Sequence, residues 1–149
     1  PGRFLNHAWQ PEWRLRLVRR TQARWTGLDP HDKLEVTREP GQSVIDLPGT
    51  LRHDSFATFT EQLAKEATYA RLMARSLHAS GVRGSRLRVL TSPPGAMLKQ
   101  LVIKQAWRDG VPGFLAAGST AASTLMKHLA LLEISHSAGH EATREDRGT

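Results

Sequence analysis

Arginines and tryptophans near the start of the chain have side chains suited to binding anionic or planar groups. Four of the seven residues in 14–20 are arginine, and planar, permanently charged guanidinium groups suit phosphate or carboxylate recognition. Trp9, Trp13 and Trp25 lie before, at the edge of and after this run, and indole rings can stack on a sugar or a base. The alternative is a solvated basic face with its tryptophans in a core. Composition alone leaves both interpretations open.

Two histidines stand where acid–base or metal chemistry is feasible. His31 precedes Asp32 in a turn, and an imidazole beside a carboxylate can move a proton when their surroundings bring either pKa toward neutrality. A surface turn is the plainer explanation of this pair. His53 precedes a long expected helix, where it can ligate a metal or cap the helix. The sequence has no Walker loop, glycine-rich dinucleotide fingerprint or Gly-x-Ser-x-Gly motif, which excludes those motif-defined classes.

The first region of the chain, residues 1–55, is expected to form short strands separated by turns. Trp13–Val18 alternates apolar and basic side chains, Leu34 and Val36 repeat the two-residue period, and residues 44–47 follow it more loosely. Pro and Gly pairs punctuate these runs as turns. This is too little sheet to stand alone.

A helical region is expected over residues 56–135, and its first helix has the clearest pattern. Thr58 and Glu61 have capping-box spacing, and Gly81 supplies the left-handed stop. Apolar residues at three- and four-residue steps form one stripe. The residues of that stripe are Phe56, Phe59, Leu63, Ala67, Ala70, Met73 and Leu77.

Two further helices are expected after the basic loop 83–88. The first begins near Pro94, which suits an initial helical turn, and Gly110 separates it from the next. Residues 111–126 carry no charge and are rich in small side chains, which predicts a closely packed or interfacial helix. Residues 136–149 are polar and aperiodic, which predicts a disordered tail.

Composition narrows the class of protein further. The chain has 149 residues, a formal net charge of +7, 39% hydrophobic residues and no cysteine. That length suffices for one domain with a core. A mean hydropathy of −0.43 excludes a polytopic membrane protein, and disulfides are excluded outright. The first residue is Pro1, and no signal-peptide pattern follows it.

Several short segments follow one another in a distinctive order along most of the chain. They are Phe4–Glu12, Arg14–Arg20, Ala23–Gly27, Pro30–Leu34, Leu47–Phe56, Leu98–Gly110 and Pro112–Phe114. In this order they resemble the second half of a family-two glycosyltransferase, in the branch that adds glucose or similar sugars to lipopolysaccharide core or builds related glycans. Residues 47–56 are similar to that branch's Gly-x-Leu-x-His-x-Ser-Tyr segment, and the last two segments resemble its C-terminal helical signature.

The resemblance implies an α/β fold of the GT-A type, of which this chain would be the C-terminal, α+β part: short strands followed by three helices. It implies an inverting transfer from a nucleotide-sugar, such as a UDP-sugar, with a divalent metal, Mg²⁺ or Mn²⁺. Asp32 takes the position of the general base that deprotonates the acceptor hydroxyl, where the family usually has Glu. His53 takes the position of the histidine that completes the metal and diphosphate site.

The same resemblance assigns substrate contacts. The residues expected to hold phosphates of the donor or acceptor are Arg16, Arg19 and Arg20. Trp9 and Trp25 are expected to line the cleft for a glycan or lipid-linked acceptor, with His31 beside them. Family members carry an Asp-x-Asp metal motif before this region, and this chain has none. We therefore expect a fragment that lacks the nucleotide-binding half and does not turn over on its own.

Basic residues near apolar faces in the C-terminal part suggest a second kind of contact. Lys99, Lys104, Arg108 and Lys127 fit adsorption to an anionic membrane surface, where each cation adds about 1 kcal/mol. This predicts a cytoplasmic protein, peripheral on the inner face of the cell membrane. The alternative is an ordinary packed helical subdomain.

Two rival functions follow from the charge. A basic nucleic-acid-binding module is suggested by Trp beside Arg, but the cations are spread along the chain and no nucleic-acid motif occurs, so no nucleic acid is expected as a partner. A non-catalytic, membrane-associated helical adaptor leaves the sheet-like first region unexplained.

Overall fold

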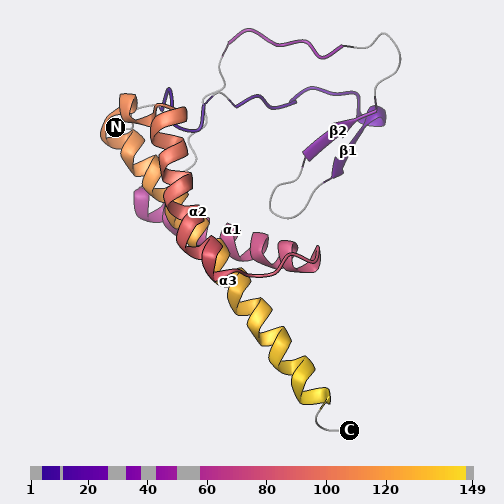
Figure 1. Cartoon of the computed structure of the whole chain (residues 1–149). Coiled ribbons are helices and arrows are strands. Elements are labelled where there is room, and N and C mark those ends of the chain that lie inside the picture. The colour runs from indigo at the N-terminus through magenta and orange to yellow at the C-terminus, as the bar shows by residue number, and fades with distance from the viewer. Residues whose placement is uncertain (1–4, 11, 27–32, 38–42, 50–57, 147–149) are drawn as a thin grey trace.

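The chain folds into a two-stranded sheet followed by three long helices (Figure 1). The computed structural model describes residues 5–10, 12–26, 33–37, 43–49 and 58–146. The mixed α+β composition expected from the sequence is confirmed, as are three helices after the strands.

Helix α1, Phe59–Ala79, begins and ends where its capping residues require. The hydroxyl of Thr58 accepts a hydrogen bond from the amide of Glu61 at 3.1 Å, which satisfies one of the free amides of the first turn. At the other end Gly81 has φ +89°, and the amide of Val82 donates to the carbonyl of Leu77 at 2.9 Å. With the bond from the amide of Gly81 to the carbonyl of His78 at 3.0 Å, this is the pair of bonds of a Schellman motif. The predicted N-cap and glycine C-cap are therefore both confirmed.

Helix α2, Arg86–Leu98, starts earlier than its sequence suggests. The loop expected over 83–88 is too long, because the helix already begins at Arg86. The start expected at Pro94 is wrong, because Pro93 and Pro94 both lie inside the helix. A proline there removes an amide donor and disfavours a helix locally. Pro93 is buried and α2 packs along α3, so tertiary packing overrides the local preference. A π-helical turn, Lys99–Ile103, and a 3-10 turn, Ala106–Asp109, then lead into α3.

Helix α3, Val111–Asp146, is the long central element. Gly110 precedes it with φ +66°, as the predicted break requires. The small-residue stretch is closely packed, as expected: Ala116, Ala117 and Ser119 are all buried. The helix continues to Asp146 through residues expected to form a disordered tail, since extending an existing helix costs far less than starting one. Among the described residues, no helix is both long and apolar enough to cross a membrane.

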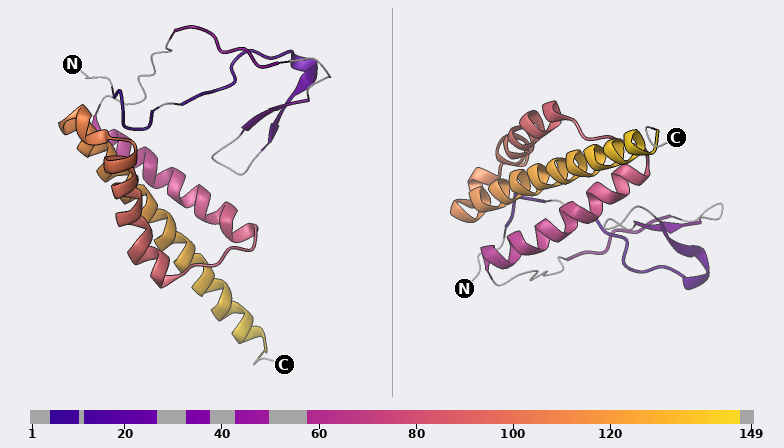
Figure 2. Two further views of the ribbon diagram at one scale, coloured as in Figure 1. Left: turned by 45° about the horizontal axis from the view of Figure 1, so that its top comes forward. Right: turned by 90° about the horizontal axis from the view of Figure 1, so that it is seen from below.

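The three helices form one layer with α3 in the middle (Figure 2). The buried amide of Gln62 donates to the hydroxyl of Ser119 at 2.8 Å, which joins the first turns of α1 to the early turns of α3. Gly84, just before α2, packs on the backbone of Leu132, and its amide donates to Ser135 Oγ at 2.8 Å. Helix α1 therefore runs parallel to α3, and α2 runs antiparallel to it.

The sheet is a single antiparallel pair, β1 (Ala23–Thr26) and β2 (Lys33–Val36). Ala23 stands opposite Val36 and Thr26 opposite Lys33, which confirms the strand expected around Leu34. The strands expected over 13–18 and 44–47 are wrong: neither segment has regular structure. A strand needs a hydrogen-bonded neighbour, and the alternating pattern supplies only side chains. The hairpin stands to one side of the helices (Figure 1).

The core of the described residues consists mainly of small side chains. Its fully packed hydrophobic members are Ala8, Ala70, Ala74, Ala106, Ala116, Ala117 and Leu131. Alanines let helix backbones approach closely but remove little apolar area from water. Many larger apolar side chains therefore remain exposed, on the helices and within residues 12–49 alike.

Candidate functional site

Two segments far apart in the sequence meet at the carboxylate of Asp109. The amides of His7 and Ala8 donate to Oδ2 at 2.9 and 2.8 Å, and the amide of Asn6 donates to Oδ1 at 3.1 Å. Nδ1 of His7 lies 2.8 Å from Oδ1. We call this set of four contacts the Asp109 latch. It fixes residues 6–8 on the turn that precedes α3.

The latch requires an ionised carboxylate. The Asp109 side chain is only 3% exposed. Burial by itself raises the pKa of this carboxyl, but the hydrogen bonds from Ala8, His7 and Asn6 together lower it to about 2. Asp109 is therefore a saturated acceptor, and its contacts leave it no role as a base. Since an ionised carboxylate only accepts hydrogen bonds, it holds the proton on Nδ1 of His7.

Trp9, the residue after the latch, also holds the N-terminal segment on the helices. Its ring packs against the cluster formed by Ala8, Ala106 and Ala116, and its Nε1 donates to the hydroxyl of Thr120 at 3.0 Å. The sequence assigns Trp9 to an acceptor cleft; the structure gives the half-buried ring a packing partner on α3. The N-terminal segment is thus fixed to the helices at two adjacent points.

A hollow of about 470 Å³ opens beside the latch. Its lining residues are Asn6, His7, Gln10, Ile103, Lys104 and Gln105. Within the described ranges, Trp9 at φ 61° and Gln105 at φ 53° are the non-glycine residues with positive φ. Such backbone is costly and is often found at functional sites. Both residues border the region where the two segments join.

The residues expected to carry catalysis are not placed by the structure. Asp32, His31 and His53 all lie outside the described residues. In the part of the chain that the structure describes, no group of three or more His, Asp or Glu side chains is arranged to hold a metal ion.

The other expected substrate contacts lie on the N-terminal arm, which we define as residues 12–49. Arg16, Arg19 and Arg20 are exposed, and Arg20 begins a 3-10 turn that leads into β1. Trp25 is 71% exposed on β1, opposite Leu34. The three arginines lie just before β1 in the chain. It places Trp9 on the helices and Trp25 on the hairpin, so the two rings belong to different elements.

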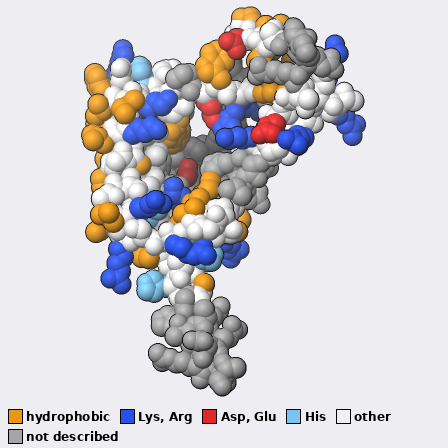
Figure 3. Space-filling model, turned by 45° about the vertical axis from the view of Figure 1, so that its right-hand side comes forward, with side chains coloured by type: hydrophobic (Ala, Val, Ile, Leu, Met, Phe, Trp, Pro, Cys, Tyr) orange, Lys and Arg blue, Asp and Glu red, His pale blue; other side chains and the backbone are white. Residues whose placement is uncertain are grey.

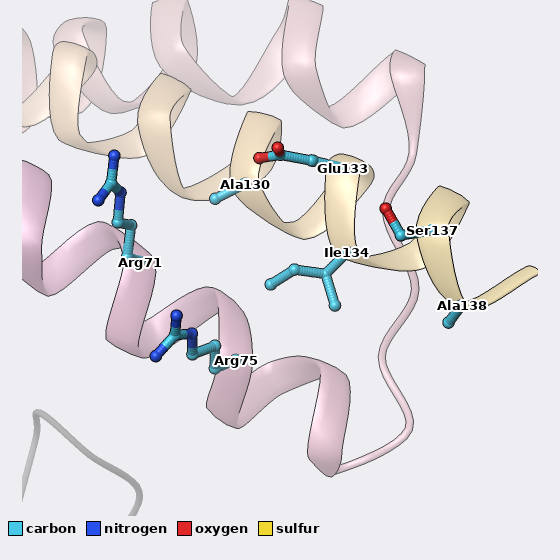
Figure 4. Close-up of a pocket in the computed structure, with 7 residues that line it drawn as sticks. All are labelled: Arg71, Arg75, Ala130, Glu133, Ile134, Ser137 and Ala138. Carbon is cyan, nitrogen blue, oxygen red and sulfur yellow. The ribbon is translucent and has the colours of Figure 1, made fainter. Parts of the chain in front are cut away.

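A second hollow, of about 490 Å³, lies between α1 and α3 (Figure 4). Arg71 and Arg75 project from successive turns of α1, Ile134 of α3 points into the gap, and Glu133 stands at its border. The exposed guanidinium groups give it a basic wall. None of the residues singled out by the sequence lies here.

Sequence reasoning missed the latch. His7 and Asp109 both lie within segments noted only for their resemblance, and Asp109 stands next to the predicted helix break at Gly110. The two are 102 positions apart, so no local periodicity links them. The one available signal is that both belong to segments that resemble the same family.

No family model matches this sequence, and no solved structure matches this fold.

Proposed function

We propose that this chain is the acceptor-side part of an inverting family-two glycosyltransferase of GT-A type, which moves a sugar from a nucleotide-sugar to a glycan or lipopolysaccharide-core acceptor. The order of the segments in the sequence supports this proposal. The observation that carries it furthest is the Asp109 latch, because it joins the first of those segments, 4–12, to the C-terminal one, 98–110. Segments that are parts of one enzyme should form one structural unit, and these two do.

In this proposal Asp32 is the general base. A carboxylate within about 3 Å of the acceptor hydroxyl can take its proton as the hydroxyl attacks the anomeric carbon. Asp is one methylene shorter than the Glu usual in the family, so the acceptor must approach the backbone more closely. His53 would contribute to holding a divalent metal, Mg²⁺ or Mn²⁺, which offsets the charge gathered by the leaving diphosphate.

Arg16, Arg19 and Arg20 would bind phosphates of the donor or of the acceptor. Their exposure leaves the guanidinium groups available to a ligand. Trp25 offers an exposed ring to an acceptor sugar. Trp9 would shape the acceptor cleft from the helical side.

Apolar exposure on the arm gives independent support. Trp13 is 72% and Leu17 78% exposed, although their alternating pattern is typical of a half-buried strand. A two-stranded hairpin alone is marginally stable in water. Both facts fit an arm that forms part of a larger sheet, as in a GT-A domain.

The first experiment measures uridine nucleotide binding by the 149-residue chain with and without Mg²⁺ or Mn²⁺. We expect weak, metal-dependent binding of UDP that His53→Ala removes, and no sugar transfer from a UDP-sugar, since the chain has no Asp-x-Asp motif. Sugar transfer by the chain alone would contradict the proposed division of the site.

The second experiment fuses an Asp-x-Asp-bearing nucleotide-binding half ahead of Pro1. We expect transfer that Asp32→Asn lowers at least 100-fold, the range of general-base catalysis. Asp46→Asn, a change at an exposed carboxylate of the same arm, is the matched control and should leave the rate unchanged. Binding of generic DNA or RNA that falls steeply with salt, without nucleotide preference, would favour the nucleic-acid-binding alternative.

A further inference from the structure

Helix α2 presents an apolar face that nothing in the described chain covers. At about 100° per residue, its outward apolar positions fall within one stripe, while Val89, Ser92 and Ala96 point the other way, toward α3. We call this stripe the α2 face. Its residues are Leu87, Leu90, Pro94, Met97 and Leu98.

The apolar surface continues past the end of α2. In the two turns that follow, Val102, Ile103 and Trp107 are between 58% and 70% exposed. Within α2, Leu87 and Leu90 reach 69% and 72%. Figure 3 shows hydrophobic side chains gathered along one edge of the helical part, with Lys and Arg beside them. An exposed apolar band of this kind marks an interaction site.

The charges around the band have one sign. Residues 83–108 contain six Lys or Arg and no Asp or Glu. Arg86, Arg88, Lys99 and Arg108 are exposed. On the helical wheel Arg86 borders one side of the stripe, whereas on the other side Thr91 and Gly95 lie between the stripe and Arg88. Along the chain the band lies between the exposed cations Arg86 and Arg108, with Lys99 at the end of α2.

We propose that the α2 face, with its continuation to Trp107, docks on the surface of an anionic lipid bilayer. Apolar side chains between cations suit the boundary between acyl chains and anionic headgroups, and a tryptophan at the edge suits the same depth. A second copy of the chain would oppose cations to cations across this face. The inference rests on the exposed residues of α2 and of the two turns that follow it, and it does not depend on the proposed glycosyltransferase activity.

The experiment is co-sedimentation of the 149-residue chain with two kinds of vesicle. One consists of phosphatidylcholine alone, and in the other about one lipid in three is the anionic phosphatidylglycerol. We expect binding to the anionic vesicles only, and release by high salt. Leu90→Gln/Leu98→Gln should weaken binding about tenfold or more, because two large apolar groups leave the interface. Lys99→Gln and Arg108→Gln should each weaken it about fivefold, the equivalent of 1 kcal/mol per cation.

Tyr69→Ser, a change at an exposed aromatic residue of α1, is the matched control and should bind as the unchanged chain does. Circular dichroism confirms that each variant is folded. Quenching of tryptophan fluorescence by brominated lipid is measured on the unchanged chain and on Trp107→Phe. The difference between the two shows whether Trp107 lies at the bilayer surface, and the substitution leaves the α2 face unchanged. Equal binding to neutral vesicles, no binding to either, no Trp107 quenching, or a concentration-dependent dimer that the Leu90→Gln/Leu98→Gln change disrupts would each overturn the proposal.

Discussion

The helical part, residues 58–146, and the N-terminal arm, residues 12–49, differ in whether they have a packed interior: the helices bury side chains against one another, and none of the described residues of the arm is buried. The helices approach closely through alanine, glycine and serine, and polar groups such as Gln62 are buried with a hydrogen-bond partner. The arm has apolar residues of larger size, such as Leu17 and Ile45, yet these are 78% and 77% exposed. An apolar pattern predicts burial only where a neighbouring element exists to provide it.

The comparison predicts that the largest effects on stability come from close contacts between helices. A Cβ at Gly113 would lie 1.8 Å from the carbonyl oxygen of Ala106, a backbone atom that cannot move without shifting the turn before α3. We expect Gly113→Ala to lower the free energy of unfolding by about 3 kcal/mol, measured by urea unfolding followed by circular dichroism.

Gly118 provides the matched control on the same helix. A Cβ there meets nothing within 4 Å, so Gly118→Ala should stabilise the chain by up to about 1 kcal/mol through helix propensity. Similar destabilisation by both changes would show that α3 does not pack as described.

The second effect concerns the latch that joins the N-terminal segment to the helices. Because the pKa of Asp109 is lowered to about 2 in the folded chain, its ionised form favours folding by about 2 kcal/mol above pH 4. This contribution should be lost as pH falls from about 4 to about 2. Asp109→Asn should remove it at neutral pH, flatten the acid limb and make the N-terminal segment more sensitive to limited proteolysis.

Asp46→Asn, at an exposed carboxylate of the arm, controls for the change of charge and should alter neither stability nor cleavage. An unchanged cleavage rate in Asp109→Asn would mean that the segment is held by other contacts.

A smaller effect is expected at His128, which is buried on α3 and whose Nδ1 has no hydrogen-bond partner among the residues that the structure describes. Burial first, then the charges of Lys127 and Arg88, lower its pKa below the usual 6.5. The unfolded chain therefore binds the proton more readily, and stability should fall as pH drops below about 6.5. His128→Leu should flatten this slope in thermal unfolding between pH 7 and 5, whereas His136→Gln, at an exposed histidine, should leave it intact.

The smallest pair of effects compares two tryptophans. Trp9→Phe removes the hydrogen bond from Nε1 to Thr120 and should cost about 1 kcal/mol. Trp25→Phe, on the exposed face of β1, should change the free energy of unfolding by less than about 0.5 kcal/mol. Equal effects in urea unfolding would indicate that the hairpin is packed as firmly as the ring of Trp9.

The sequence predicts what depends on neighbours along the chain. The ends of α1 follow from Thr58 and Gly81, and the close packing of α3 follows from its run of small, uncharged residues. Both signals are local. The start of α2 could not be predicted, because Pro93 and Pro94 argue against a helix and only packing on α3 overrides them.

The latch could not be predicted for a different reason. Asp109 reads as a turn residue, and the donors that complete it are backbone amides near the N-terminus. Amides carry no sequence signature, so only the three-dimensional arrangement reveals them. The catalytic interpretation of Asp32 and His53 remains a prediction from resemblance, since both lie outside the described residues.

The central position of α3 has a consequence for biosynthesis. Helices α1 and α2 each pack on α3 far more than on one another, and the N-terminal anchor requires Asp109 and Thr120. On the ribosome, α1, α2 and the N-terminal segment are all made before α3. The apolar stripes of α1 and α2 that pack on α3 therefore stay exposed until α3 emerges, the stage at which an incomplete chain is most open to aggregation.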